Sequence, residues 1–156
     1  MGHGEFVVLD IGDAIVPFAQ RDQHGDLLSS EELLAEGELI LYFYPADFTP
    51  VCTAEACLFR DNFSELEDVG VRIVGVSPQD AKSHQRFTES FELPFSLLCD
   101  TDKTLIDAFG VAGPLGIGVR RVTYLIGRDS VIRGRSVADV FLGNHSDLIN
   151  EVLAEA

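Results

Sequence analysis

Residues 42–57 read Tyr-Phe-Tyr-Pro-Ala-Asp-Phe-Thr-Pro-Val-Cys-Thr-Ala-Glu-Ala-Cys, and this stretch is the most informative part of the chain. It begins inside a short apolar run, residues 39–44, that is typical of a buried strand. Thr49 then fits the N-cap of a helix, and Pro50 fits the first helical position. The stretch therefore predicts a strand, a short loop, and a helix that begins just before Cys52.

The rest of the chain alternates short apolar runs with helical patterns, and its 156 residues suit a single domain spanning residues 1–156. We expect strands at residues 6–9, 16–19, 39–44, 71–76, 95–98, 122–126 and 131–137. We expect helical segments at residues 30–35, from Pro50 to Gly70, after a Ser77 cap, at residues 103–109 and after a Ser146 cap. This order predicts an α/β fold with helices on both faces of a central sheet, made mixed by the antiparallel last strand pair. It is compatible with a thioredoxin-like fold that carries an N-terminal β extension.

The composition excludes several classes of partner. With 26 acidic and 11 basic residues, the chain has a net charge of −15, which argues against nucleic acid and anionic membrane surfaces. No apolar run approaches the roughly 20 residues that span a bilayer, and residues 1–5 lack a signal-peptide pattern, so we expect a cytoplasmic protein. The acidity leaves two interpretations open, an ordinary acidic protein or a halophile-like adaptation to a cytosol of high ionic strength.

The chain has three cysteines, Cys52, Cys57 and Cys99, which we expect to be catalytic, metal-binding or inert rather than a disulfide scaffold. If Thr49 caps the helix, Cys52 lies in the first turn, where free backbone N–H groups and the helix dipole favour a thiolate. The same N–H groups suit a polar oxygen substrate. The alternative is that Cys52 is a small buried apolar residue. The cap and the second cysteine favour the reactive interpretation.

The spacing between Cys52 and Cys57 bears on whether the two can form a disulfide. Five residues along an α-helix place the two Cα atoms roughly 8.7 Å apart, which exceeds the ~7 Å limit for a disulfide. A bond between them therefore requires the first turns of the helix to unwind. This gives a hypothesis: the helix is folded in the reduced protein and locally unfolded in the oxidised protein.

Pro45, Thr49 and Cys52 resemble the signature of the peroxiredoxins, Pro-x-x-x-Thr-x-x-Cys. The sequence is most similar to the bacterioferritin comigratory protein group, also called peroxiredoxin Q. The similarity runs from Gly12 to the end and includes residues 74–77, 83–87, 93–95 and 121–126, where Arg121 matches the family's active-site arginine. The chain departs from the family at residues 15–18, 37–38 and 127, and residues 47–52 look more like the typical two-cysteine branch. The oligomeric state therefore stays open between monomer and homodimer.

The resemblance implies a thiol-dependent peroxidase that reduces hydrogen peroxide and organic hydroperoxides in antioxidant defence and redox homeostasis. Cys52 would attack the peroxide and become a sulfenic acid. Thr49 would hydrogen-bond the thiolate and the peroxide, and Arg121 would stabilise their negative charge. Pro45 would shield the thiolate from water, and Val51 would help to line the substrate site.

The remaining candidate residues have supporting roles. The resemblance implies that Cys57 resolves the sulfenic acid as an intramolecular disulfide, which thioredoxin or a similar dithiol then reduces, and it implies no cofactor. Glu55 either orients an arginine or is an exposed helix acid, and the sequence leaves both open. We interpret Cys99 as a buried bystander, and we assign surface roles to the four histidines, His3, His24, His84 and His145.

Three other functions compete with this interpretation. A thiol-disulfide oxidoreductase on the same fold would need Cys-x-x-Cys, whereas the spacing here is Cys-x-x-x-x-Cys. A metal-binding module using the three cysteines would need a fourth ligand close in sequence, and no histidine falls there, so we expect no metal site. A non-catalytic interaction protein would not need Pro45, Thr49, Cys52 and Arg121 intact.

Overall fold

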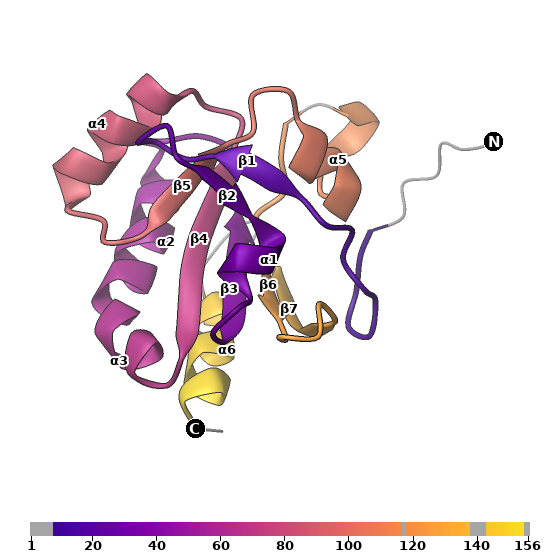
Figure 1. Cartoon of the computed structure of the whole chain (residues 1–156). Helices are drawn as coiled ribbons and strands as arrows, with labels where there is room; N and C mark the ends of the chain where they lie inside the picture. Colours follow the sequence, from indigo (N-terminus) through magenta and orange to yellow (C-terminus); the bar gives the residue numbers. More distant parts are fainter. Residues whose placement is uncertain (1–7, 117, 138–142, 155–156) are drawn as a thin grey trace.

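A five-stranded mixed sheet forms the centre of the molecule (Figure 1). The computed structural model describes residues 8–116, 118–137 and 143–154. The strand order is β5-β4-β3-β6-β7, with β3, β4 and β5 parallel and the β3–β6 and β6–β7 pairs antiparallel. The strands are β3 (Glu38–Phe43), β4 (Val71–Ser77), β5 (Ser96–Cys99), β6 (Val122–Ile126) and β7 (Ile132–Val137). The predicted mixed sheet is confirmed, with each strand within one residue of its expected bounds.

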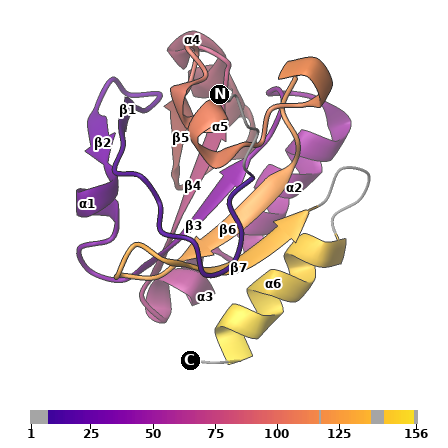
Figure 2. The same ribbon diagram turned by 90° about the vertical axis from the view of Figure 1, so that its right-hand side faces the viewer.

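Helices cover both faces of this sheet (Figures 1 and 2). One apolar cluster takes side chains from α2 (Pro50–Asp61), α3 (Phe63–Asp68), α4 (Ala81–Phe91) and α6 (Gly143–Ala154). The other takes side chains from α1 (Ser30–Leu33) and α5 (Thr104–Phe109). The two clusters lie on opposite sides of β3, so the sheet is buried on both faces, as an α/β fold requires.

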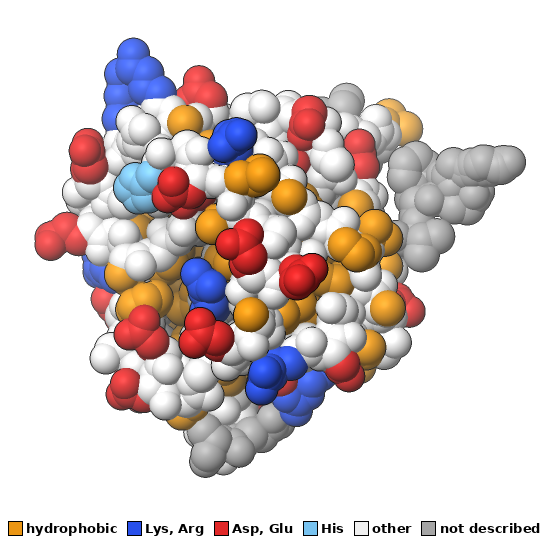
Figure 3. Space-filling view, in the orientation of Figure 1, with side chains coloured by type: hydrophobic (Ala, Val, Ile, Leu, Met, Phe, Trp, Pro, Cys, Tyr) orange, Lys and Arg blue, Asp and Glu red, His pale blue; other side chains and the backbone are white. Residues whose placement is uncertain are grey.

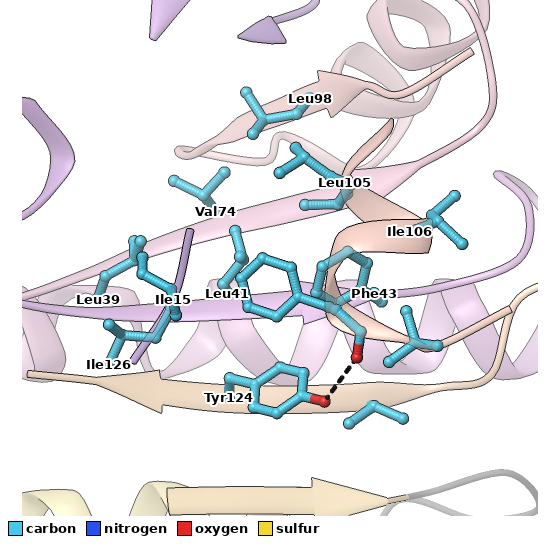
Figure 4. Close-up of a cluster of buried hydrophobic side chains, with 14 of the residues drawn as sticks. Ile15, Leu39, Leu41, Phe43, Val74, Leu98, Leu105, Ile106, Tyr124 and Ile126 are labelled. Atoms are coloured by element: carbon cyan, nitrogen blue, oxygen red, sulfur yellow. Dashed lines mark hydrogen bonds between the residues drawn. The ribbon is translucent and has the colours of Figure 1, made fainter. Parts of the chain in front are cut away.

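Alternation along β3 lets one strand serve both clusters. Leu39, Leu41 and Phe43 belong to the cluster that includes α5, where Figure 4 shows Leu39 beside Ile15, whereas Ile40 and Tyr42 belong to the other cluster. All five side chains are fully buried. The continuous apolar run that predicted this strand therefore reflects burial on both faces.

Aromatic rings fill the space between the sheet and α2. Tyr42 stacks on Phe59 of α2 with ring centroids 4.6 Å apart and on Tyr44 with centroids 5.4 Å apart. Phe87 of α4 packs beside Tyr44 at a centroid distance of 6.2 Å. These rings fix the position of α2 on the sheet, and with it the position of the N-terminus of that helix.

The N-terminal β extension is present, but its strands differ from the expected ones. The strand pair is β1 (Ala19–Arg21) and β2 (Leu27–Ser29), which are antiparallel. Asp22 fixes the turn between them, because its Oδ1 accepts hydrogen bonds from the backbone N–H groups of His24 and Asp26. The hairpin is therefore closed by a turn at residues 22–26, after the strand that was expected at residues 16–19.

The strands expected at residues 6–9 and 16–19 are wrong where the structure describes them. Residues 6–7 lie outside the described residues, residues 8–9 are not in a strand, and only the last residue of 16–19 belongs to β1. The backbone here bonds elsewhere: the N–H of Ile15 donates to the carbonyl of Ser130, in the turn before β7. This segment therefore has its partner in the distant β6–β7 turn.

Two expected helix boundaries also need correction. The helix expected from Pro50 to Gly70 is interrupted at Asn62, whose side-chain amide donates to the carbonyl of Leu58, and this divides α2 from α3. The final helix begins at Gly143, so Ser146 lies inside α6 and does not cap it.

The start of α4 differs for a different reason. Ser77 was expected to cap this helix, but it is a buried residue at the end of β4. Asp80 is the N-cap instead, and its Oδ1 accepts a hydrogen bond from the backbone N–H of Ser83 at 2.9 Å. Asp80, three residues after Ser77, therefore caps α4 in place of Ser77.

On the face shown in Figure 3, acidic side chains are scattered rather than gathered in one patch. In the described part of the chain, no helix is long and apolar enough to cross a membrane. The same residues contain no group of three His, Cys, Asp or Glu side chains that could hold a metal ion.

A hollow of about 320 Å³ beside β4 and β5 is lined by residues such as Phe63 and Phe95, and it includes none of the predicted site residues.

Candidate active site

The N-terminus of α2 is built largely as the sequence predicts. Thr49 has the extended backbone of an N-cap residue, with φ −78° and ψ 150°, and Pro50 takes the first helical position. The Thr49 hydroxyl does not cap the helix, because it donates to the carbonyl of Ala46 at 3.0 Å. It therefore leaves the first-turn N–H groups to another acceptor. Cys52 lies in this turn and is 1% exposed.

Arg121 reaches Cys52 from a neighbouring strand. It lies immediately before β6, and the next residue, Val122, pairs with Phe43 at the end of β3. The loop that follows β3 therefore starts at the same end of the strands as Arg121, and it leads into α2. Its Nη2 donates to Cys52 Sγ at 3.5 Å. A guanidinium at this distance stabilises a thiolate over a thiol, as does the helix N-terminus.

Glu55 lies three residues after Cys52 and is fully buried, so the interpretation as an exposed helix acid is wrong. Its Oε1 lies 3.9 Å from Arg121 Nε, and its Oε2 lies 2.8 Å from His145 Nε2. Burial raises the pKa of Glu55 well above its usual value, although the positive charge of Arg121 acts in the opposite direction. The geometry therefore favours the other interpretation, in which Glu55 orients the arginine.

A buried carboxylate anchors the loop between β3 and α2. Asp47 Oδ1 accepts a hydrogen bond from the Tyr44 hydroxyl at 2.6 Å, and its Oδ2 lies 2.7 Å from both Ser83 Oγ and His84 Nδ1. Burial alone would raise the pKa of Asp47, but the hydrogen bond and charge of His84 and the two hydroxyls outweigh it and lower the pKa. The loop is thus tied to α4.

The other predicted site residues are close to Cys52 in the sequence and differ from it in exposure. Pro45, Thr49 and Val51 are half-buried, around the fully buried sulfur of Cys52. Phe48 has a positive φ of 66° and is 48% exposed, and its ring contacts the aromatic residues of α4.

A family model described as AhpC/TSA matches residues 11–135 of this chain. The chain belongs to the AhpC/TSA family. Two relatives show where in the peroxiredoxins it lies. The putative peroxiredoxin bcp of Coxiella burnetii is 39% identical over 130 residues, which cover 80% of this chain and 85% of that protein. The chloroplastic peroxiredoxin Q of Populus jackii is 36% identical over 129 residues, and the chain spans 60% of its length.

Solved structures confirm the thioredoxin-like peroxiredoxin fold. The peroxidoxin BcpB of Mycobacterium tuberculosis superimposes with a TM-score of 0.86 at 33% identity, covering 93% of this chain and 96% of that one. A peroxiredoxin Q of Xylella fastidiosa gives a TM-score of 0.87 at 26% identity, covering 96% and 98%. The predicted resemblance to the bacterioferritin comigratory protein and peroxiredoxin Q group is confirmed.

The other two cysteines of this peroxiredoxin differ in their surroundings. Cys57 is half-buried and lies in α2 together with Cys52, and both are free thiols within one continuous helix. Cys99 ends β5 and is half-buried, so the expected buried bystander is partly accessible. Burial raises the pKa of the Cys99 thiol to about 11, and nearby aspartates, among them Asp22, add to this effect. Cys99 is therefore a poor nucleophile at neutral pH.

The surface roles assigned to the histidines are wrong for two of the four. His84 and His145 are fully buried, whereas His24 is exposed and His3 lies outside the described residues. The spacing of apolar residues along each helix could have indicated that both histidines are buried. His84 lies three residues before Phe87, and His145 lies on the same face of α6 as Leu148, Ile149 and Val152.

Proposed function

We propose that Cys52 is the peroxidatic cysteine of a thiol-dependent peroxidase. The observation that carries this proposal is the 3.5 Å contact between Arg121 Nη2 and Cys52 Sγ, at the first turn of α2. A cation and a helix N-terminus act on the same sulfur, and both favour the nucleophilic thiolate. Membership of the peroxiredoxins supports the same chemistry.

The proposed reaction is a two-electron transfer. The Cys52 thiolate attacks the terminal oxygen of a hydroperoxide, an S–O bond forms as the O–O bond breaks, and the sulfur becomes a sulfenic acid. The leaving hydroxide or alkoxide takes a proton and departs as water or alcohol. Negative charge moves from the sulfur to the leaving oxygen, so Arg121 and the first-turn N–H groups stabilise the transition state along the whole path. Hydrogen peroxide and small organic hydroperoxides both suit this site.

Thr49, Pro45 and Val51, which are close to Cys52 in the sequence, would support the attack. The Thr49 hydroxyl, now bonded to the carbonyl of Ala46, can turn to hydrogen-bond the thiolate or a peroxide oxygen. Pro45 has no N–H and shields the sulfur from water, and Val51 places apolar surface beside the substrate. Glu55 would hold the guanidinium of Arg121 in place.

We infer that Cys57 resolves the sulfenic acid. The Cys57 thiolate would attack the sulfur of Cys52, forming an S–S bond and releasing the oxygen as water, and a thioredoxin-like dithiol would then reduce the disulfide. Because both cysteines lie in one helix, the first turns of α2 must unwind for this bond. Circular dichroism should record lower helix content in the oxidised protein, and equal content in both forms would refute intramolecular resolution.

Peroxide consumption with a dithiol reductant tests the proposal directly. The native protein should turn over, Cys52→Ser should be inactive, and Cys99→Ser should behave as the native protein. Arg121→Gln, which removes the charge, should lose about 10²–10³ in the rate constant of Cys52 oxidation. A native protein that does not consume peroxide but reduces insulin disulfides would instead favour the thiol-disulfide oxidoreductase.

Three expectations about the setting of this enzyme, namely its location, its oligomeric state and its response to salt, stay predictions. A thioredoxin-like reductant fits a cytoplasmic location, because a reducing compartment keeps thiols free. Size-exclusion chromatography would decide between monomer and homodimer. A halophile-like protein should melt at a higher temperature as salt is added, whereas an ordinary acidic protein should respond little.

A further inference from the structure

A cluster of buried polar side chains joins the C-terminal helix to the back of the active site. His145 of α6 is fully buried, and its Nδ1 lies 2.8 Å from Ser136 Oγ of β7. Its Nε2 hydrogen-bonds Thr123 Oγ1 of β6, also at 2.8 Å. Both ring nitrogens are therefore held by hydroxyls of neighbouring strands, β6 and β7, which fixes the orientation of the ring.

The ring held in this way also contacts Glu55. His145 Nε2 lies 2.8 Å from Glu55 Oε2, and a nitrogen and an oxygen this close attract each other only if a proton lies between them. Burial and the charge of Arg121 lower the pKa of His145 to about 4, so the ring is neutral near pH 7. The shared proton lies on Nε2 when the Ser136 hydroxyl donates to Nδ1, or on Glu55 when its carboxyl group is protonated, and either arrangement joins the ring to the carboxyl group.

The Glu55 carboxyl group has few polar contacts that could fix its orientation. It is fully buried, and among the described residues neither of its oxygens accepts a well-aligned hydrogen bond. Its polar contacts in that part of the chain are His145 on one oxygen and Arg121 on the other. Burying a carboxyl group in this way is destabilising, which indicates a role in the site rather than in folding.

We propose that His145 is a positioning residue for peroxide reduction, which holds the Glu55 carboxyl group so that Arg121 is directed at Cys52. The line of contacts runs from α6 to the sulfur: His145 Nε2 to Glu55 Oε2, Glu55 Oε1 to Arg121 Nε, and Arg121 Nη2 to Cys52 Sγ. The inference rests on the proposed function, and it makes α6 part of the active site.

Two substitutions of His145 distinguish the contacts of Nε2 from those of Nδ1. In His145→Gln the amide nitrogen takes the place of Nε2 and can donate to both Thr123 and Glu55. In His145→Asn the shorter amide reaches only the position of Nδ1, beside Ser136. His145→Leu removes both contacts, and His24→Asn changes an exposed histidine as a control.

Two rate constants of each fully reduced variant are measured at one pH: oxidation of Cys52 by hydrogen peroxide and alkylation of Cys52 by iodoacetamide. His145→Gln and His24→Asn should oxidise within about threefold of the native rate, whereas His145→Asn and His145→Leu should lose about tenfold to hundredfold. Alkylation should fall less, because it depends on Arg121 only through the thiolate, whereas peroxide reduction also needs Arg121 to stabilise the peroxide oxygens. In a Glu55→Gln background, His145→Leu should cause no further loss.

Equal oxidation rates for His145→Gln and His145→Asn would overturn the proposal. So would equal losses in oxidation and alkylation together with a lower melting temperature, because that pattern indicates a structural role. If His145→Leu does not fold, the Gln and Asn variants decide alone. A native protein inert to peroxide would refute the proposed function itself, whereas an active native protein with equal Gln and Asn variants would refute this inference alone.

Discussion

Replacing Asp47 by alanine should destabilise the protein more than replacing any exposed carboxylate. The side chain of Asp47 is fully buried, and it is the shared partner of Tyr44, Ser83 and His84. Alanine would leave the buried Tyr44 hydroxyl and His84 Nδ1, and the half-buried Ser83 hydroxyl, without this acceptor. The His84 ring is held on its far side by the carbonyl of Leu98 at 3.1 Å, so it cannot turn away without losing that contact.

The expected loss follows from the chemistry of the pair. Removing one partner of a buried ion pair costs about 3–5 kcal/mol. A domain of this size has an unfolding free energy of about 5–15 kcal/mol, so the variant would lose a large part of its stability. At about 2–4 °C per kcal/mol, the melting temperature should fall by roughly 10 °C.

Urea denaturation followed by circular dichroism measures the loss, with Asp61→Ala as the matched control. Asp61 pairs with Arg60 at 3.0 Å, but its side chain is 65% exposed, and such a surface pair contributes about 0–1 kcal/mol. If Asp47→Ala loses no more stability than Asp61→Ala, the loop is not anchored through this carboxylate.

The same carboxylate predicts a pH dependence. Burial opposes ionisation, but His84, Ser83 and Tyr44 together lower the pKa of Asp47 in the folded protein. A carboxyl group with a lowered folded-state pKa stabilises the fold above its unfolded pKa, and this contribution is lost as the pH falls through the folded pKa. The native protein should therefore lose stability below about pH 4 more steeply than Asp47→Ala. Parallel acid curves would refute the assignment.

Three further predictions concern single residues. Cys99, with its pKa of about 11, should be the slowest of the three thiols to react with iodoacetamide at pH 7.5, and peptide mass spectrometry would reveal the order. Gly37→Ala should destabilise the fold by about 1–3 kcal/mol in urea denaturation, because a Cβ there would lie 1.9 Å from the backbone oxygen of Gly70. Cys57→Ser should complete one round of peroxide reduction but stall with Cys52 as a sulfenic acid, which dimedone labelling would detect.

The sequence predicted the features that depend on local pattern. The residues of β6 were placed without error, and the helix that presents Cys52 starts where the Thr49-Pro50 pair indicated. Both follow from short-range rules, namely apolar runs for buried strands and cap residues for helix starts. Arg121 was found through the family resemblance, because no local rule brings the residue before β6 to a cysteine 69 positions away.

The features that the sequence did not predict depend on long-range contacts. Asp47 and His84 are 37 positions apart, and each alone looks like an ordinary surface residue. Only the fold brings α4 beside the loop after β3, which converts two polar residues into a buried pair. The same applies to His145, whose position on an apolar stripe was visible but whose partners come from α2, β6 and β7.

These contacts divide the surroundings of Cys52 into a fixed part and a part that can open. Asp47 ties the loop before α2 to α4, and this connection does not depend on the hydrogen bonds within α2. Arg121 contacts the start of α2 through Cys52 Sγ. If Cys52 is oxidised to a sulfenic acid and Cys57 resolves it, this contact must break before the first turns of α2 unwind. Such local opening at a functional site requires less free energy than global unfolding, provided that Phe59, further along the helix, keeps its stacking on Tyr42.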